Sequence, residues 1–245
     1  MQGAIHIGTS GWSYKDWRGR FYPEKMVTTD YLAYYAQHFS TTEINTSFYH
    51  LPRAETIKHW ASVVGKNFIF CPKISRYVTH IKKLEDPRET LPKFFELFDP
   101  VKQQLGPVLI QLPPSLSFDE EKAIEFYKAL KHYKGYHFAL EGRHESWLAE
   151  ESIALLEKYG IAFVIAESGR RRPYVEKFTD RHVYLRFHGA DDHYASYPDE
   201  VLHSFAQKIK QWKKEGHIVW VFFNNDGNAH AVFNAKKLIE MTGSS

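Results

Sequence analysis

Eight short apolar segments spread along the whole chain constrain the fold more than any other feature of this sequence. Each is rich in β-branched or aromatic residues and is bounded by turn residues, as expected for a buried strand. These segments are residues 4–9, 42–46, 67–74, 107–112, 137–142, 161–166, 182–188 and 218–224. They recur at about 31 residues per unit, which is the length of a strand followed by a helix.

Helical patterns separate most of the strand-like segments. The expected helices are residues 31–39, 54–64, 88–105, 120–132, 147–159, 199–215 and 228–241. Asp30 and Asp119 stand where N-capping residues are expected, Pro92 and Pro100 interrupt the third pattern, and residues 167–181 predict no long helix. Alternation of this kind predicts parallel strands joined by right-handed crossovers.

Eight such units in 245 residues predict an α/β fold of the TIM (β/α)8 type, a closed barrel formed by residues 1–245 as a single domain. A doubly wound open sheet is the alternative. That fold favours a glycine-rich phosphate turn after the first strand, and Gly8-Thr9-Ser10-Gly11-Trp12 does not match the G-x-G-x-x-G pattern. The sequence therefore favours the barrel.

Composition narrows the class of protein. Lys and Arg exceed Asp and Glu by three charges, which is too few to indicate a nucleic-acid partner on its own. A single cysteine, Cys71, excludes an internal disulfide and fits a reducing compartment. No signal peptide pattern or apolar run of membrane-spanning length is evident, so a cytoplasmic protein without a membrane partner is expected.

Polar residues share one alternation parity in strands two to eight and gather where each strand ends. Side chains of one parity point into a barrel, and ligands of such folds bind at the carboxyl ends of the strands. The predicted pocket floor consists of Glu43, Asn45, Lys73, Gln111, Glu141, Arg143, Glu167, Arg186, His188, Asn224 and Asp226. The alternative is an ion-pair network that closes the end of the barrel.

The residue types suggest roles for this cluster. Paired carboxylates and a titratable base suit acid–base chemistry, and the predicted catalytic residues are Glu43, Glu141, His188 and Lys73. Arginines and amides suit capture of an anion beside aromatic walls, and the predicted ligand-binding residues are Trp12, Asn45, Tyr49, Gln111, Arg143, Arg186, Asn224 and Asp226.

No cofactor is predicted, because paired Cys or His ligand spacings are missing from the sequence. A divalent metal on Glu141, His188 and Asp226 stays open as an alternative.

Basic and aromatic loop residues support a second hypothesis about the ligand. Aromatic residues follow several strands, namely Trp12, Tyr14, Trp17, Phe48, Tyr49, Trp147, Tyr194 and Tyr197. Basic residues are expected on the same face, namely Arg18, Arg20 and Arg170–Arg172. This combination suits a phosphate-rich or single-stranded nucleic acid. For Trp17 and Trp147, packing between loops and helices is the favoured interpretation.

Several motifs, in order along nearly the whole chain, carry a resemblance to a known family. They are Gly8-Thr9-Ser10-Gly11-Trp12, Glu43-Ile44-Asn45-Thr46-Ser47-Phe48-Tyr49, Gln111-Leu112-Pro113-Pro114, Glu141-Gly142-Arg143-His144-Glu145-Ser146-Trp147, Arg186-Phe187-His188-Gly189 and Phe223-Asn224-Asn225-Asp226. The chain resembles the YecE-like family, also called domain of unknown function 72. This resemblance implies a cytoplasmic TIM barrel and supplies no established activity. Glu167-Ser168-Gly169 departs from it, because an aspartate is expected there.

The sequence predicts a protein that binds a small phosphate- or carboxylate-bearing ligand, such as a sugar phosphate, at the carboxyl end of the barrel. Arg143, Arg186 and Lys73 would hold the anion, and a hydrolase or isomerase is possible. One alternative is a nucleic-acid-binding or endonuclease-like protein, and another is a non-enzymatic scaffold. The sequence leaves the oligomeric state open.

Overall fold

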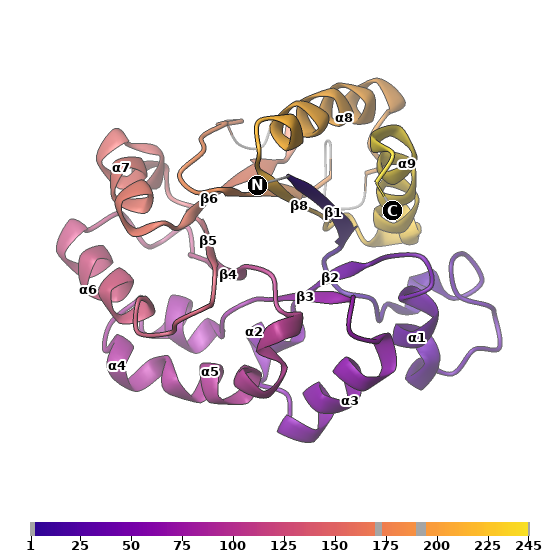
Figure 1. Ribbon diagram of the computed structural model, residues 1–245, viewed down its shortest axis with the longest axis horizontal. Coiled ribbons are helices and arrows are strands. Elements are labelled where there is room, and N and C mark those ends of the chain that lie inside the picture. The colour runs from indigo at the N-terminus through magenta and orange to yellow at the C-terminus, as the bar shows by residue number, and fades with distance from the viewer. Residues whose placement is uncertain (1–2, 170–172, 190–194, 245) are drawn as a thin grey trace.

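The computed structural model describes residues 3–169, 173–189 and 195–244. Its strands run parallel to one another, with helices packed around their outer side (Figure 1). The strands are β1 (Ala4–Thr9), β2 (Thr41–Ile44), β3 (Ile69–Pro72), β4 (Val108–Gln111), β5 (Phe138–Glu141), β6 (Ala162–Glu167), β7 (His182–Phe187) and β8 (Ile218–Phe223). All eight strands expected from the sequence are present.

The α-helices of the described residues are α1 (Tyr31–Tyr35), α2 (Thr46–Tyr49), α3 (Ala54–Val64), α4 (Pro87–Thr90), α5 (Pro92–Phe98), α6 (Glu120–Leu130), α7 (Glu150–Tyr159), α8 (Asp199–Lys214) and α9 (His230–Thr242). The predicted cap at Asp119 is confirmed, because its carboxylate accepts from the Lys122 amide at 3.0 Å. The cap at Asp30 is wrong, since its side chain makes no bond to α1. The pattern over 88–105 is divided between α4, α5 and a short 3-10 helix (Asp99–Gln104).

Hydrogen-bonded pairing divides the strands into two sheets. Six strands form one open parallel sheet in the order β1-β8-β7-β6-β5-β4, and β2 pairs with β3 in a second sheet. The expectation of a closed eight-stranded TIM barrel is therefore wrong. The chain is an α/β protein with an open, six-stranded parallel half-barrel.

Between β1 and β2, hydrogen bonds from a side chain take the place of a continuous backbone ladder. The Tyr35 hydroxyl lies between these strands, accepts from the Thr9 amide at 3.0 Å and donates to the Thr41 carbonyl at 3.1 Å. At Gly8 an added Cβ would lie 2.2 Å from the Thr41 carbonyl oxygen, so only glycine permits this approach. Between β3 and β4 the pairing is limited to isolated bridges, among them Lys73 with Leu109.

Alternate side chains of the strands pack inside the curved sheet. One inner cluster lies apart from the larger core between strands and helices, and it contains Cys71, Leu109, Ala139, Ala162, Val164, Tyr184, Trp220 and Phe222. The predicted parity holds for β3, β4, β5, β7 and β8, but it is wrong for β6. There Val164 faces inward beside Tyr184, so Glu167 has the opposite parity and does not belong to the pocket floor.

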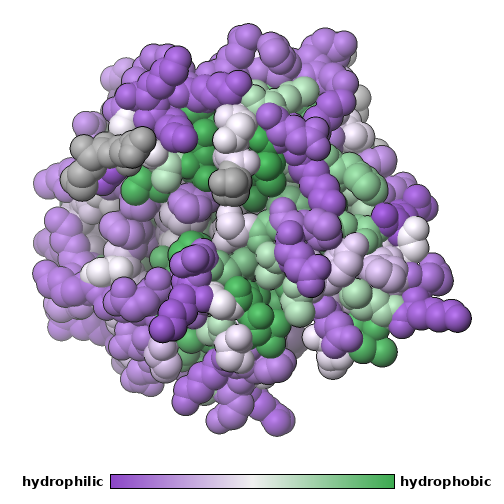
Figure 2. Space-filling view, turned by 45° about the vertical axis from the view of Figure 1, so that its right-hand side comes forward, coloured by the Kyte–Doolittle hydropathy of each residue, from purple (hydrophilic) through white to green (hydrophobic). Residues whose placement is uncertain are grey.

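The surface of the molecule is largely hydrophilic at its rim, with hydrophobic residues gathered toward the middle of the face in Figure 2. Among the residues that the structure describes, none of the helices is both long and apolar enough to cross a bilayer.

Three histidines lie near the amino-terminal ends of β1, β5 and β7. The His6 ring stacks on Trp220 with centroids 4.1 Å apart, and the His137 and His182 rings lie 4.2 Å apart. The Trp220 indole donates to His182 Nδ1 at 2.9 Å, so this nitrogen carries no proton. Burial lowers the pKa of His6 to about 4 and the pKa of His182 to about 3.

The buried histidines make stability depend on acid. The pKa values of His6 and His182 are lower in the folded protein than in the unfolded chain, where they are near 6.5. Between pH 6.5 and about 4 the unfolded chain therefore binds more protons, and the free energy of unfolding falls as the pH is lowered. His182→Gln should reduce this loss by at least about 1 kcal/mol over that window. Urea unfolding at several pH values measures the effect. The exposed control His132→Gln should keep the wild-type pH dependence, and an unchanged dependence in His182→Gln would contradict the assignment.

Candidate functional site

A buried arginine joins two carboxylates at the carboxyl ends of the strands. Arg186 on β7 has 1% of its surface exposed. Its Nη2 and Nε lie 2.8 and 3.0 Å from the two oxygens of Glu43 on β2, and its Nη1 lies 2.6 Å from Glu141 Oε2 on β5. One guanidinium therefore connects strands of both sheets, across the two places where the ladders are interrupted.

Both carboxylates have further donors. Glu43 accepts from the Tyr184 hydroxyl at 3.0 Å. Glu141 accepts from Gln111 at 2.8 Å, from Arg143 Nε at 3.1 Å and from His188 Nε2 at 3.2 Å. Burial opposes the charge of Glu141, but the arginines overcome this effect and hold the pKa of its carboxyl well below its usual range.

Lys73, which follows β3, is held differently from the arginines. Its Nζ donates to Gln111 Oε1 at 2.7 Å and lies 3.8 Å from the centre of the Phe48 ring. It forms no ion pair with a carboxylate of the described residues. Burial and the charge of Arg186 lower the pKa of Lys73 to about 7, although Glu43 and Glu141 act in the opposite direction.

A cavity of about 470 Å³ opens above this network, and we call it the strand-end cavity. Its lining residues are Tyr14, Asn45, Tyr49, Lys73, Gln111, Arg143, Arg186, Asn224 and Asp226. Seven of the eight residues proposed as ligand-binding from the sequence line it, as does Lys73. Trp12 instead lines an adjoining cavity of about 220 Å³, which shares Tyr14, Asn45 and Tyr49 with the first.

Three of the proposed catalytic residues lie beneath the cavity. Glu43, Glu141 and His188 are buried and do not line it. Burial lowers the pKa of His188 to about 4, with Glu141 opposing, so the imidazole is neutral at pH 7. Both carboxylates are occupied by arginines, so the geometry of the described residues gives no support for the expected hydrolase.

Asp226 lies in the loop that follows β8 and lines the strand-end cavity together with Lys73. The Trp17 indole donates to its carbonyl at 2.9 Å, and the chain then turns through the left-handed region at Asn228 and Ala229. Burial raises the pKa of the Asp226 carboxyl to about 7, although a hydrogen bond with Tyr14 acts against this. Asn45 lines the same cavity, and its amide donates to the Ser10 carbonyl at 3.2 Å.

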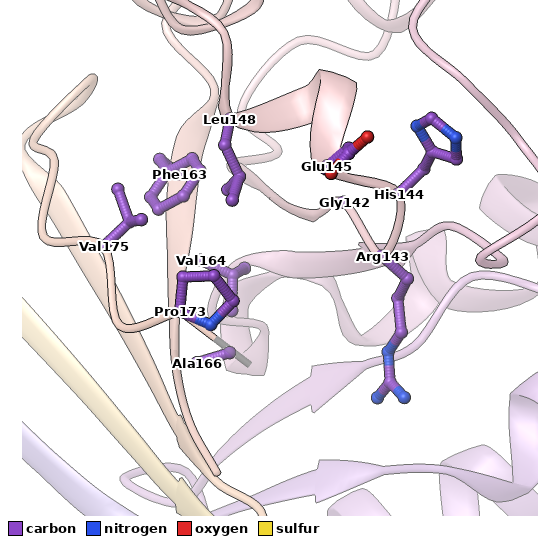
Figure 3. A pocket seen from close by; sticks show the side chains of 10 residues that line it. All are labelled: Gly142, Arg143, His144, Glu145, Leu148, Phe163, Val164, Ala166, Pro173 and Val175. Carbon is purple, nitrogen blue, oxygen red and sulfur yellow. The ribbon is translucent and has the colours of Figure 1, made fainter. Parts of the chain in front are cut away.

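A third cavity, of about 170 Å³, lies beside β5 and β6 and shares Arg143 with the strand-end cavity (Figure 3). Leu148, Phe163 and Val175 form its apolar side, and the Arg143 side chain extends away from them.

Several of the aromatic and basic loop residues named from the sequence do not line the strand-end cavity. Trp17 and Trp147 are buried and pack as expected, with indole bonds to the carbonyls of Asp226 and Leu116. Arg18 binds the Tyr31 hydroxyl at 3.1 Å and lines a separate cavity. Arg170–Arg172 and Tyr194 lie outside the described residues.

Two contributors to the site are not among the residues predicted from the sequence. Tyr184 donates to Glu43, and the inward parity that it shares with Arg186 is the signal that could have placed it in the site. The carbonyl of Ser10, which orients Asn45, leaves no mark in a sequence pattern. Among the described residues no group of three or more His, Cys, Asp or Glu side chains is arranged to hold a metal, so Glu141, His188 and Asp226 do not form one there.

Removing the central arginine leaves two buried carboxylates without their main partner. Arg186→Met should lower the free energy of unfolding by about 3–5 kcal/mol at pH 7. The loss should shrink as the pH is lowered, because protonation removes the uncompensated charges. Denaturant unfolding measures both effects. Lys208→Met removes the partly exposed pair with Glu176 and should cost no more than about 1 kcal/mol, so equal costs would contradict the central role of Arg186.

Comparison with known proteins agrees with the fold and the motifs. The family model described as "Protein of unknown function DUF72" matches residues 6–245. The chain is 27% identical to the UPF0759 protein YunF of Bacillus subtilis, over 97% of this chain and 94% of YunF, and 28% identical to the UPF0759 protein YecE of Escherichia coli K12, over 85% and 82%. A crystal structure of a DUF72 family protein from Thermotoga maritima superposes with a TM-score of 0.89 at 29% identity, covering 98% of this chain and all of that one. The chain therefore belongs to the DUF72 family of YecE-like proteins.

Proposed function

We propose that this protein binds a small anion, bearing a phosphate or carboxylate group, in the strand-end cavity. The observation that carries the proposal is the position of Lys73. Its ammonium is nearly buried, lines the cavity and forms no ion pair with any carboxylate that the structure describes. A buried cation without a counter-ion is costly, and an anion in the cavity would supply one.

The charges beneath the cavity support this proposal. Arg186 and Arg143 oppose Glu43 and Glu141, which gives two positive and two negative charges in direct ion pairs. The ammonium of Lys73 is additional to these pairs. A ligand on this side of the cavity therefore meets an excess of positive charge.

Arg143 offers a second contact for an anion. Its Nε and Nη2 both point to Glu141 Oε1, whereas its Nη1 has no hydrogen-bond partner in the described part of the chain. A guanidinium held on one edge by a carboxylate presents its remaining N–H groups in a fixed direction. Lys73 and Arg143 follow strands on either side of β4 and together form the donor side of the site.

Sulfate is a suitable probe because its charge is constant near neutral pH. Lys73 should bind it as an ammonium, so the affinity should fall as the pH rises above about 7 and the lysine loses its proton. The other charged groups that act on Lys73 are Arg186, Arg143, Glu43 and Glu141. Asp226 lines the same cavity, and burial raises its pKa to about 7, so the negative charge that it gains over this range weakens sulfate binding in the same direction. Titration calorimetry at pH 6.5 and 8.5 should show a loss on the order of tenfold, as for one charge-assisted contact.

Lys73→Met should bind sulfate about tenfold more weakly at pH 6.5 and should keep only the part of the pH dependence that Asp226 contributes. The matched control Lys134→Met removes an exposed lysine at the other end of the strands and should match the wild type. Sulfate binding that is equally strong in wild type and Lys73→Met would refute the proposed site.

A further inference from the structure

The strand-end cavity has two chemically different sides. Lys73, Gln111 and Arg143 follow or end the neighbouring strands β3, β4 and β5, and they present hydrogen-bond donors. The side formed by β8, β1 and β2 carries Asp226 and Asn45, beside Tyr14. The cation nearest this second side is Arg186, whose guanidinium is committed to Glu43 and Glu141, so this side suits a different part of a ligand.

The second side contains acceptors whose hydrogen-bonding capacity is unused. Asn45 donates through Nδ2 to the Ser10 carbonyl. This bond fixes the orientation of the amide, so that Oδ1 points away from Ser10. Asn45 Oδ1 and Asp226 Oδ1 are buried and have no hydrogen-bond partner among the described residues. A buried acceptor without a donor is unfavourable, and a donor on the ligand would satisfy it.

We infer that the ligand is a hydroxylated anion, whose acidic group lies against Lys73 and Arg143 and whose hydroxyl groups lie against Asp226 and Asn45. The inference rests on the proposed function, since it takes the anion as bound on the lysine side. The exposed ring of Tyr49 and the ring of Tyr14 line the same cavity and give apolar surface between the two sides. Sugar phosphates and other polyol phosphates have this combination of groups.

A hydroxyl fits the acceptor side better than an ammonium group does. Lys73, Arg143 and Arg186 line the same cavity and would repel a second cation. Burial raises the pKa of Asp226 to about 7, so near neutral pH this carboxyl is present in both protonation states. A hydroxyl group can donate to the carboxylate and accept from the carboxylic acid, whereas an ammonium group can only donate.

Paired probes of equal charge test the inference. Glycerol 3-phosphate is compared with propyl phosphate, and glucose 6-phosphate with cyclohexylmethyl phosphate, each by titration calorimetry. The hydroxylated member of at least one pair should bind at least about tenfold more tightly to the wild type, as for one or two recovered hydrogen bonds. Because this comparison uses the wild-type protein, it does not depend on the folding of a variant.

Variants assign the preference to its side of the cavity. Asp226→Ala should remove most of the preference and leave the affinity for propyl phosphate within about twofold. Asp226→Asn keeps the shape and one acceptor, and should retain part of the preference. Asp16→Ala removes an exposed aspartate outside the cavity lining and serves as the matched control.

The possible outcomes separate the two proposals. If no phosphate binds, the proposed function fails and this inference fails with it. If both members of each pair bind equally, the inference is overturned and the proposed function stands. A preference that Asp226→Ala and Asp226→Asn leave unchanged, or tighter binding of O-phosphoethanolamine than of glycerol 3-phosphate, would also overturn it.

Discussion

The structure of the site depends on the ion pairs of Arg186 with Glu43 and Glu141. These three side chains are almost fully buried, and they connect β2 of the smaller sheet with β5 and β7 of the larger one. Burying one of these charges alone would be strongly unfavourable, so each requires the others. The same bonds fix the floor on which Lys73, Gln111 and Arg143 stand, and they occupy the carboxylates that would otherwise neutralise the lysine.

The proposed function rests on the polar groups that this network leaves without partners. A lysine without a carboxylate partner faces one side of the strand-end cavity, and acceptors without donors lie on the other. Two ionisable groups, Lys73 and Asp226, each have a pKa of about 7 for opposite reasons: burial disfavours the ammonium of one and the carboxylate of the other. These two sides are the basis for proposing a ligand that carries an acidic group at one end and hydroxyl groups at the other.

Much of this arrangement could be predicted from alternation in the sequence. The eight strands and the polar residues at their ends follow from apolar runs and parity, and Asn45, Lys73, Gln111, Arg143 and Asp226 do line one cavity. The break in the barrel between β1 and β2 could not be predicted, because there the hydroxyl of Tyr35, a helix residue, bonds the backbone groups of Thr9 and Thr41. The parity of β6 was also missed, since its apolar run contains no polar residue to mark the inner face before Glu167.

The position of a bound anion tests the central claim most directly. Crystals soaked in selenate would reveal the anion by its anomalous scattering. The account predicts a selenate ion within hydrogen-bond distance of Lys73 Nζ and Arg143 Nη1, with its occupancy lost in Lys73→Met. Selenate found only on the outer surface, with the strand-end cavity free of anion in crystals whose packing leaves it open, would contradict the account.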